Sequence, residues 1–182
     1  MQELSMHILD IVENSTRADA GLVEIRITED RTNDLLTIEI TDNGAGMDRE
    51  TLEKVLDPFY STKKVRRIGL GIPLLAYAAQ KAGGDFHIDS ERGVGTRVHV
   101  RFRHSHIDRQ PIGNMAETMV TLIAGNPASD FIYNHVNDHR EFSVDTREIR
   151  KELEDVPVNH PEVLKFIKET IEDGLKEIGV SD

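Results

Sequence analysis

The sequence predicts an α/β two-layer sandwich, in which a mixed, largely antiparallel sheet packs against helices on one face, plus a C-terminal α+β extension. Three observations favour this class. An amphipathic helical segment opens the chain, strand-like and helical segments alternate up to about residue 103, and the composition changes near residues 105–113. We therefore expect two parts, residues 1–107 and an extension over residues 108–182 whose role the sequence leaves open.

The first part contains clear periodicities. Leu4, Ile8, Ile11, Ser15 and Ala18 recur at helical spacing, which predicts a helix over 2–18. The other expected elements are strands over 22–28, 35–41, 85–90 and 96–103, a short helix that Asp48 would cap, and a helix over 72–82 that ends at Gly83 and Gly84.

The extension is expected to contain a helix over 114–124, a hairpin over 131–145 with a polar tip at 137–139, and two further helices. The last helix is strongly amphipathic. Such a helix is more often packed within its own chain than bound to a partner, so binding is the minority interpretation. We interpret His104, His106, His135 and His139 as surface or packing residues rather than metal ligands.

Composition limits the possible partners. The 182-residue chain has a net charge of −11 and no cysteine, which excludes disulfides and favours a reducing, cytoplasmic location. The acidic surface argues against nucleic acid, and the absence of a long apolar run argues against a membrane. Lys63, Lys64, Arg66 and Arg67 form a local basic cluster that suits a small polyanion, although a solvated loop is the simpler interpretation.

The opening helix places Asp10 and Asn14 on one face, because the two residues are four apart. An amide oxygen is a hard, neutral ligand that suits Mg²⁺, and a carboxylate one turn away can orient or deprotonate a water molecule. By itself this pair is weak evidence for a metal or catalytic site, since Asp and Asn four residues apart on a helix usually form only a polar face.

Two glycine-bearing segments follow predicted strands or open helices. Asp42-Asn43-Gly44-Ala45-Gly46-Met47 comes directly after a strand and before a helical segment, which argues against a simple hairpin turn. Gly69-Leu70-Gly71-Ile72 opens a helix, where free N–H groups can face phosphate oxygens. Between them lies Asp57-Pro58-Phe59-Tyr60-Ser61-Thr62-Lys63, which begins a basic loop.

Taken in order with Gly95-Thr96, these segments resemble the ATPase superfamily of gyrase, heat-shock chaperones, histidine kinases and MutL, whose ATP site is called the Bergerat fold. The resemblance covers residues 4–103. From Asp57 onward the chain is most similar to sensor histidine kinase catalytic domains, whereas Ile8–Ser15 looks closer to the MutL type.

The resemblance implies ATP and Mg²⁺ as cofactors and a residue for each task. Asn14 would coordinate Mg²⁺, Asp42 would accept from the adenine amine, and Asp10 would be the catalytic residue. Lys63 would be the lid cation. The further nucleotide-binding positions implied are Gly44, Gly46, Met47, Phe59, Thr62, Gly69, Leu70, Gly71 and Thr96.

Two departures keep the reaction open. Asp10 stands where the hydrolytic branches carry Glu and the sensor kinases usually carry Asn. The sequence also lacks a histidine-box pattern, so we do not expect a self-contained two-component sensor. Three functions are compatible with this pattern: a kinase-like regulator of a separate protein partner, a slow MutL-type ATPase switch, and a nucleotide sensor without chemistry. The oligomeric state also stays open, a homodimer included.

Overall fold

The structure is a computed structural model that describes residues 2–57 and 71–180. The elements of the first part are α1 (Leu4–Arg17), β1 (Leu22–Asp30), β2 (Leu35–Asp42), α2 (Arg49–Val55), α3 (Gly71–Lys81), β3 (Asp85–Glu91) and β4 (Gly95–Arg103). Those of the second part are α4 (Met115–Gly125), β5 (Asp130–Asn137), β6 (Arg140–Asp145), α5 (Thr146–Leu153) and α6 (Pro161–Glu177). The strands and helices expected from the sequence are therefore all present.

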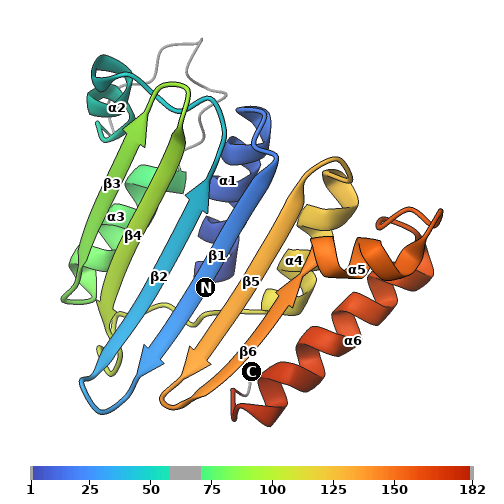
Figure 1. Cartoon of the computed structure of the whole chain (residues 1–182). Helices are drawn as coiled ribbons and strands as arrows, with labels where there is room; N and C mark the ends of the chain where they lie inside the picture. Colours follow the sequence, from blue (N-terminus) through green and yellow to red (C-terminus); the bar gives the residue numbers. More distant parts are fainter. Residues whose placement is uncertain (1, 58–70, 181–182) are drawn as a thin grey trace.

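All described strands belong to one sheet with the order β3-β4-β2-β1-β5-β6 (Figure 1). Neighbouring strands run antiparallel except β1 and β5, which are parallel. The mixed, largely antiparallel sheet predicted from the sequence is thus confirmed. The β5–β6 hairpin is also confirmed, and its tip lies between Asn137 and Arg140.

Helices α1, α3 and α4 cover one face of this sheet, and the opposite face is open (Figure 1). Alternate residues of β1, among them Val23, Ile25 and Ile27, are buried under the helices. The apolar side chains of α1, among them Leu4, Ile8 and Ile11, pack against these strand residues. Within the described ranges, no helix is both long and apolar enough to cross a bilayer.

Local capping explains where the helices begin and end. The Asp48 carboxylate accepts a hydrogen bond from the Thr51 amide at 2.8 Å, which confirms it as the N-cap of α2. Asn114 caps α4 in the same way through the amide of Glu117, at 2.9 Å. Helix α3 ends before Gly83, whose φ of +66° is a conformation that glycine adopts without strain.

The C-terminal extension completes the sheet. Strand β5 lies along the edge of β1 that β2 leaves open, with Leu22 opposite Asp130 and Glu29 opposite Asn137. The hydrophobic core runs without interruption from α1 to α6, which packs on α4. Because β1 needs a partner on both edges, the extension protects a strand that would otherwise be exposed. The division into a domain over residues 1–107 and an extension over residues 108–182 stays a prediction.

Candidate nucleotide-binding site

A cavity of about 270 Å³ lies between α1, the ends of β2 and β4, and the loop that follows β2. Several residues predicted to bind nucleotide contribute to its wall, although they come from separate segments. The lining residues are Ile11, Asn14, Ser15, Ala18, Ile40, Asp42, Gly46, Met47, Thr51, Ile72, Thr96 and Val98. The walls are mostly apolar, and the polar groups are few, as in most small-molecule sites.

Asp42, the last residue of β2, is fixed by two hydrogen bonds. The Ser15 hydroxyl donates to its Oδ2 at 2.5 Å, and the Gly44 amide donates to its Oδ1 at 2.9 Å. Ser15 is almost fully buried in α1, so this contact ties the helix to the end of the strand. The carboxylate retains further acceptor capacity, because each ionised oxygen can accept more than one hydrogen bond.

Asn14 precedes Ser15 on α1 and also lines the cavity. Its Oδ1 accepts a long hydrogen bond of 3.3 Å from the exposed Arg17 guanidinium. Its Nδ2 is buried and has no hydrogen-bond partner among the described residues. Since buried polar atoms are nearly always paired in folded proteins, an unpaired one at a cavity wall indicates a place for a ligand.

Thr96 at the start of β4 belongs to a small hydroxyl network. Its Oγ1 lies 2.8 Å from the Ser90 hydroxyl, which also accepts from the Met47 amide at 2.8 Å. The network joins the loop after β2 to the β3–β4 turn. It therefore holds Met47 and Thr96 in the same wall of the cavity.

Glycines allow this loop and the β3–β4 turn to touch. Gly46 has a φ of +65°, and a Cβ atom there would lie 1.9 Å from the carbonyl oxygen of Glu91. Gly95 has a φ of +141°, and a Cβ there would lie 2.0 Å from the carbonyl oxygen of Asp42. Gly44 lies against α1, because the amide of its neighbour Ala45 donates to the Ala18 carbonyl at 2.8 Å. The glycine spacing thus reflects close backbone contacts.

Other predicted residues lie elsewhere or outside the described ranges. Asp10 is exposed and does not line the cavity; it packs beside Gly71, where an added Cβ would be 2.8 Å from the Asp10 Cβ. Gly71 is the first residue of α3. The predictions made for Phe59, Thr62, Lys63, Gly69 and Leu70 fall outside the residues that the structure describes.

Two polar residues contribute to the cavity without being expected from the sequence. Ser15 was assigned to the apolar stripe of α1, yet it bonds to Asp42. Thr51 of α2 lines the cavity although nothing in its local sequence indicates this. A small hydroxyl residue within an apolar stripe was the only available clue, and it pointed to Ser15 alone.

A larger cavity, about 540 Å³, lies at the other end of β1 and contains none of the predicted site residues. Glu29 in its wall is buried and accepts from Nε2 of His135 at 2.9 Å and of His104 at 3.0 Å. Burial by itself would raise the pKa of Glu29, but these hydrogen bonds outweigh it and lower the pKa to about 2. The cluster is a buried polar network that joins β1, β5 and the chain after β4.

Comparison with known proteins identifies the family of the first part. The family described as "Histidine kinase-, DNA gyrase B-, and HSP90-like ATPase" matches residues 2–106, which include every described wall residue of the smaller cavity. The chain belongs to this ATPase family. Its sheet with helices on one face is the Bergerat arrangement expected from the sequence.

The curated relatives of this ATPase domain include several kinases. The sensor histidine kinase WalK of Bacillus subtilis is 32% identical over 105 residues, which cover 53% of this chain and 17% of WalK. The sensor kinase CckA of Brucella abortus is 34% identical over 84 residues, covering 46% of this chain and 9% of CckA. Sporulation kinase C of B. subtilis is 31% identical over 94 residues, covering 52% and 22%. The chain thus matches less than a quarter of each of these relatives.

Proposed function

We propose that this chain binds Mg²⁺–ATP in the cavity between α1 and the end of β2, and uses it to phosphorylate or regulate a separate protein. One observation supports the binding site above all. Asn14, Asp42, Met47 and Thr96 come from three separate segments of the chain, and all of them line one cavity. An accidental set of polar surface residues would not converge in this way.

Asp42 is proposed to select adenine. Its carboxylate is fixed at the end of β2 by Ser15 and Gly44 and can accept from the exocyclic amine of adenine. Guanine presents a carbonyl oxygen at the equivalent ring position, which a carboxylate repels. The apolar wall that includes Met47 would pack against the base, and Thr96 would support its recognition.

Asn14 is proposed to hold the metal through its amide oxygen. Mg²⁺ prefers few protein ligands and completes its shell with phosphate oxygens and water. An amide oxygen is a hard, neutral donor, and a single ligand of this kind suits an ion that takes its other ligands from phosphate and water. When bound, the ion would neutralise phosphate charge. The proposed roles of Lys63, Gly69 and Gly71 are to supply a cation and backbone donors to the phosphates.

Phosphoryl transfer to a partner is the first candidate reaction, since the curated relatives named above are kinases. A partner nucleophile would attack the γ-phosphorus, the bond to the β–γ bridging oxygen would break, and ADP would leave. Slow hydrolysis is the second candidate. It is supported by the position of Asp10 beside the first residue of α3, where a carboxylate lies close to the helix end expected to face phosphates.

Binding and chemistry need separate tests. Titration calorimetry with Mg²⁺–ATP should show binding to the wild type and none to Asn14→Ala or Asp42→Ala, while circular dichroism shows that both variants stay folded. Binding that survives in both variants would disprove the site.

The reaction is then tested with γ-labelled ATP. Transfer of label to a candidate partner supports the kinase, release of phosphate supports the ATPase, and neither supports a sensor. If phosphate is released at the same rate in Asp10→Ala, Asp10 is not the base. The second assay can fail while the first succeeds, so ATP binding and chemistry are judged independently.

A further inference from the structure

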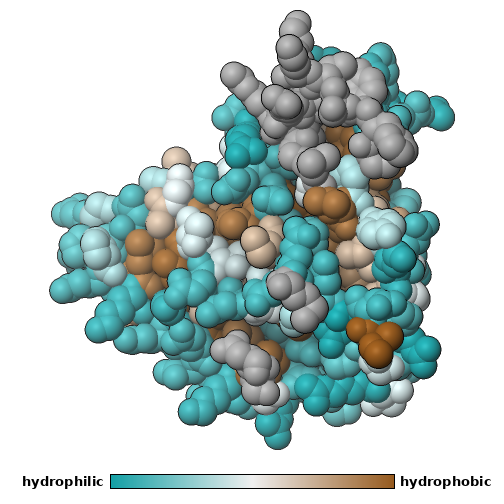
Figure 2. Space-filling model, turned by 180° about the vertical axis from the view of Figure 1, so that it is seen from behind, coloured by the Kyte–Doolittle hydropathy of each residue, from teal (hydrophilic) through white to brown (hydrophobic). Residues whose placement is uncertain are grey.

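An apolar groove of about 460 Å³ lies between α5 and α6, away from the nucleotide cavity. Its floor is formed by Ile149 and Leu153 of α5 and by Val163 and Phe166 of α6. Phe166 is 60% exposed, which is unusual for a large aromatic side chain. In Figure 2 a brown patch bordered by teal marks this edge of the molecule, at the left of the view. The groove therefore presents contiguous apolar surface to solvent.

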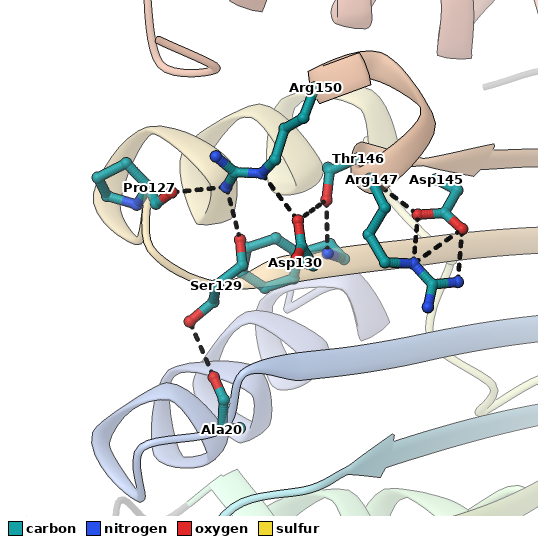
Figure 3. Close-up of polar contacts among 9 residues, drawn as sticks. Ala20, Pro127, Ser129, Asp130, Asp145, Thr146, Arg147 and Arg150 are labelled. Atoms are coloured by element: carbon teal, nitrogen blue, oxygen red, sulfur yellow. Dashed lines mark hydrogen bonds and ion pairs between the residues drawn. The ribbon is translucent and has the colours of Figure 1, made fainter.

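The α5 wall of the groove is held rigidly. The Arg150 guanidinium donates to the Asp130 carboxylate at 2.8 Å and to the carbonyl oxygens of Pro127 and Ser129 (Figure 3). The Thr146 hydroxyl donates to the same carboxylate at 3.0 Å and accepts from the Phe131 amide at 2.8 Å. A wall fixed by these bonds loses little freedom when a ligand binds, so the groove is preorganised.

The rim of the groove is acidic. Glu148, Glu152 and Glu162 border it, and none of the described residues that line it is basic. Glu148 pairs with Lys151 at 2.9 Å, but neither Glu152 nor Glu162 forms an ion pair within the part of the chain that the structure describes. Two carboxylates beside an apolar floor favour an occupant that has an apolar face and basic flanks.

This charge pattern decides among possible occupants. A second copy related by a two-fold axis would bring two acidic rims into one interface, which costs free energy because like charges repel. An anionic lipid surface would be repelled in the same way. A helix suits an apolar groove lined by two helices, because the apolar face of an amphipathic helix can lie in such a groove.

We propose that the α5–α6 groove is a docking site for a basic amphipathic helix of a partner protein, anchored on Phe166 and steered by Glu152 and Glu162. The docking does not depend on the proposed ATP chemistry, since the groove and the nucleotide cavity share no residue. The two sites are nevertheless connected through the fold. The Ser129 carbonyl accepts from Arg150, and the Ser129 hydroxyl donates to the carbonyl of Ala20 at 2.9 Å, in the connection between α1 and β1 (Figure 3).

The test uses a fluorescein-labelled synthetic helix of about 18 residues, with leucines on one face and lysines on the flanks. A control peptide has the same composition with the leucines scattered around the helix. Fluorescence anisotropy without nucleotide measures binding to the full chain. The first peptide should bind the wild type, and the scattered peptide should bind at least about tenfold more weakly.

Matched variants locate the bound peptide. Phe166→Ala should weaken binding by about tenfold, and Glu152→Lys by at least about threefold at low salt. Ile107→Ala removes an apolar side chain that is 95% exposed elsewhere, and Asp108→Lys reverses a neighbouring charge, so both controls should bind like the wild type. Circular dichroism checks that each variant is folded.

Three results would overturn the proposal. The first is no binding of the amphipathic peptide to the wild type. The second is equal loss in the groove variants and the control variants, which would show only non-specific attraction to an acidic protein. The third is a dimer in sedimentation equilibrium that Phe166→Ala dissociates, because the groove would then belong to a second copy. None of these results bears on ATP binding, which the calorimetric titration measures separately.

Discussion

The buried Glu29 cluster gives a prediction whose size follows from the structure. Replacing Glu29 by Gln removes a carboxylate that is only 6% exposed and bonded to His104 and His135. The pKa of Glu29 is lowered from 4.5 to about 2, so its ionised form stabilises the folded state. By linkage a shift of this size corresponds to about 3 kcal/mol of unfolding free energy.

The downward direction of the pKa shift determines the pH range over which the stabilisation by Glu29 is lost. A carboxyl whose folded pKa is depressed contributes its full stabilisation above the unfolded value of 4.5 and loses it as the pH falls toward about 2. The free energy of unfolding of the wild type should therefore exceed that of Glu29→Gln by a margin that shrinks by about 2 kcal/mol between pH 7 and pH 3. Other carboxylates also titrate in this range, but their contributions to the unfolding free energy are common to the variant and the wild type and cancel in the difference.

Urea unfolding followed by circular dichroism at both pH values measures this margin. Glu39→Gln is the control, because Glu39 pairs with Arg97 at 2.8 Å on the open face of the sheet and should contribute at most about 1 kcal/mol. A margin for Glu29→Gln that is the same at pH 7 and pH 3 would refute the lowered pKa. It would also refute the view that the two histidines hold an ionised carboxylate.

Three further predictions concern the nucleotide cavity. Ser15→Ala removes the 2.5 Å hydrogen bond to Asp42, so it should lower the unfolding free energy by about 1–2 kcal/mol. The same variant should bind ATP several-fold more weakly. An unchanged affinity for ATP would mean that Ser15 does not position the Asp42 carboxylate. Gly46→Ala forces a side chain into a φ of +65° against the Glu91 carbonyl, and urea unfolding should show a loss of at least about 2 kcal/mol. Gly125→Ala meets no atom within 4 Å and should be nearly neutral, so equal losses in the two glycine variants would contradict the clash. The wild type should prefer ATP to GTP, and competition binding to Asp42→Asn should show this preference lost; a preference that persists would assign base recognition to other groups.

Residues 108–182 show which features of the fold can be predicted from local sequence and which depend on pairing between distant segments. The hairpin β5–β6 was predictable, because two strand-like runs on either side of a polar tip at 137–139 are local features of the sequence. Its place beside β1 was not, since a parallel pairing between segments about a hundred residues apart leaves no local pattern. The same holds for the groove between α5 and α6, which exists only once both helices are packed.

The sequence alone determined the family, the order of the elements and the residue types of the proposed nucleotide site. Each of these depends on short segments with fixed spacing, such as Asp42 followed by Gly44 and Gly46. Only the tertiary structure decided that Ser15 bonds to Asp42, that Asp10 lies outside the cavity wall, and that Glu29 is clamped by His104 and His135. The physical reason is range: caps, periodicity and turns are set by neighbours in the chain, whereas burial, pairing and pKa depend on side chains that folding brings together from distant segments.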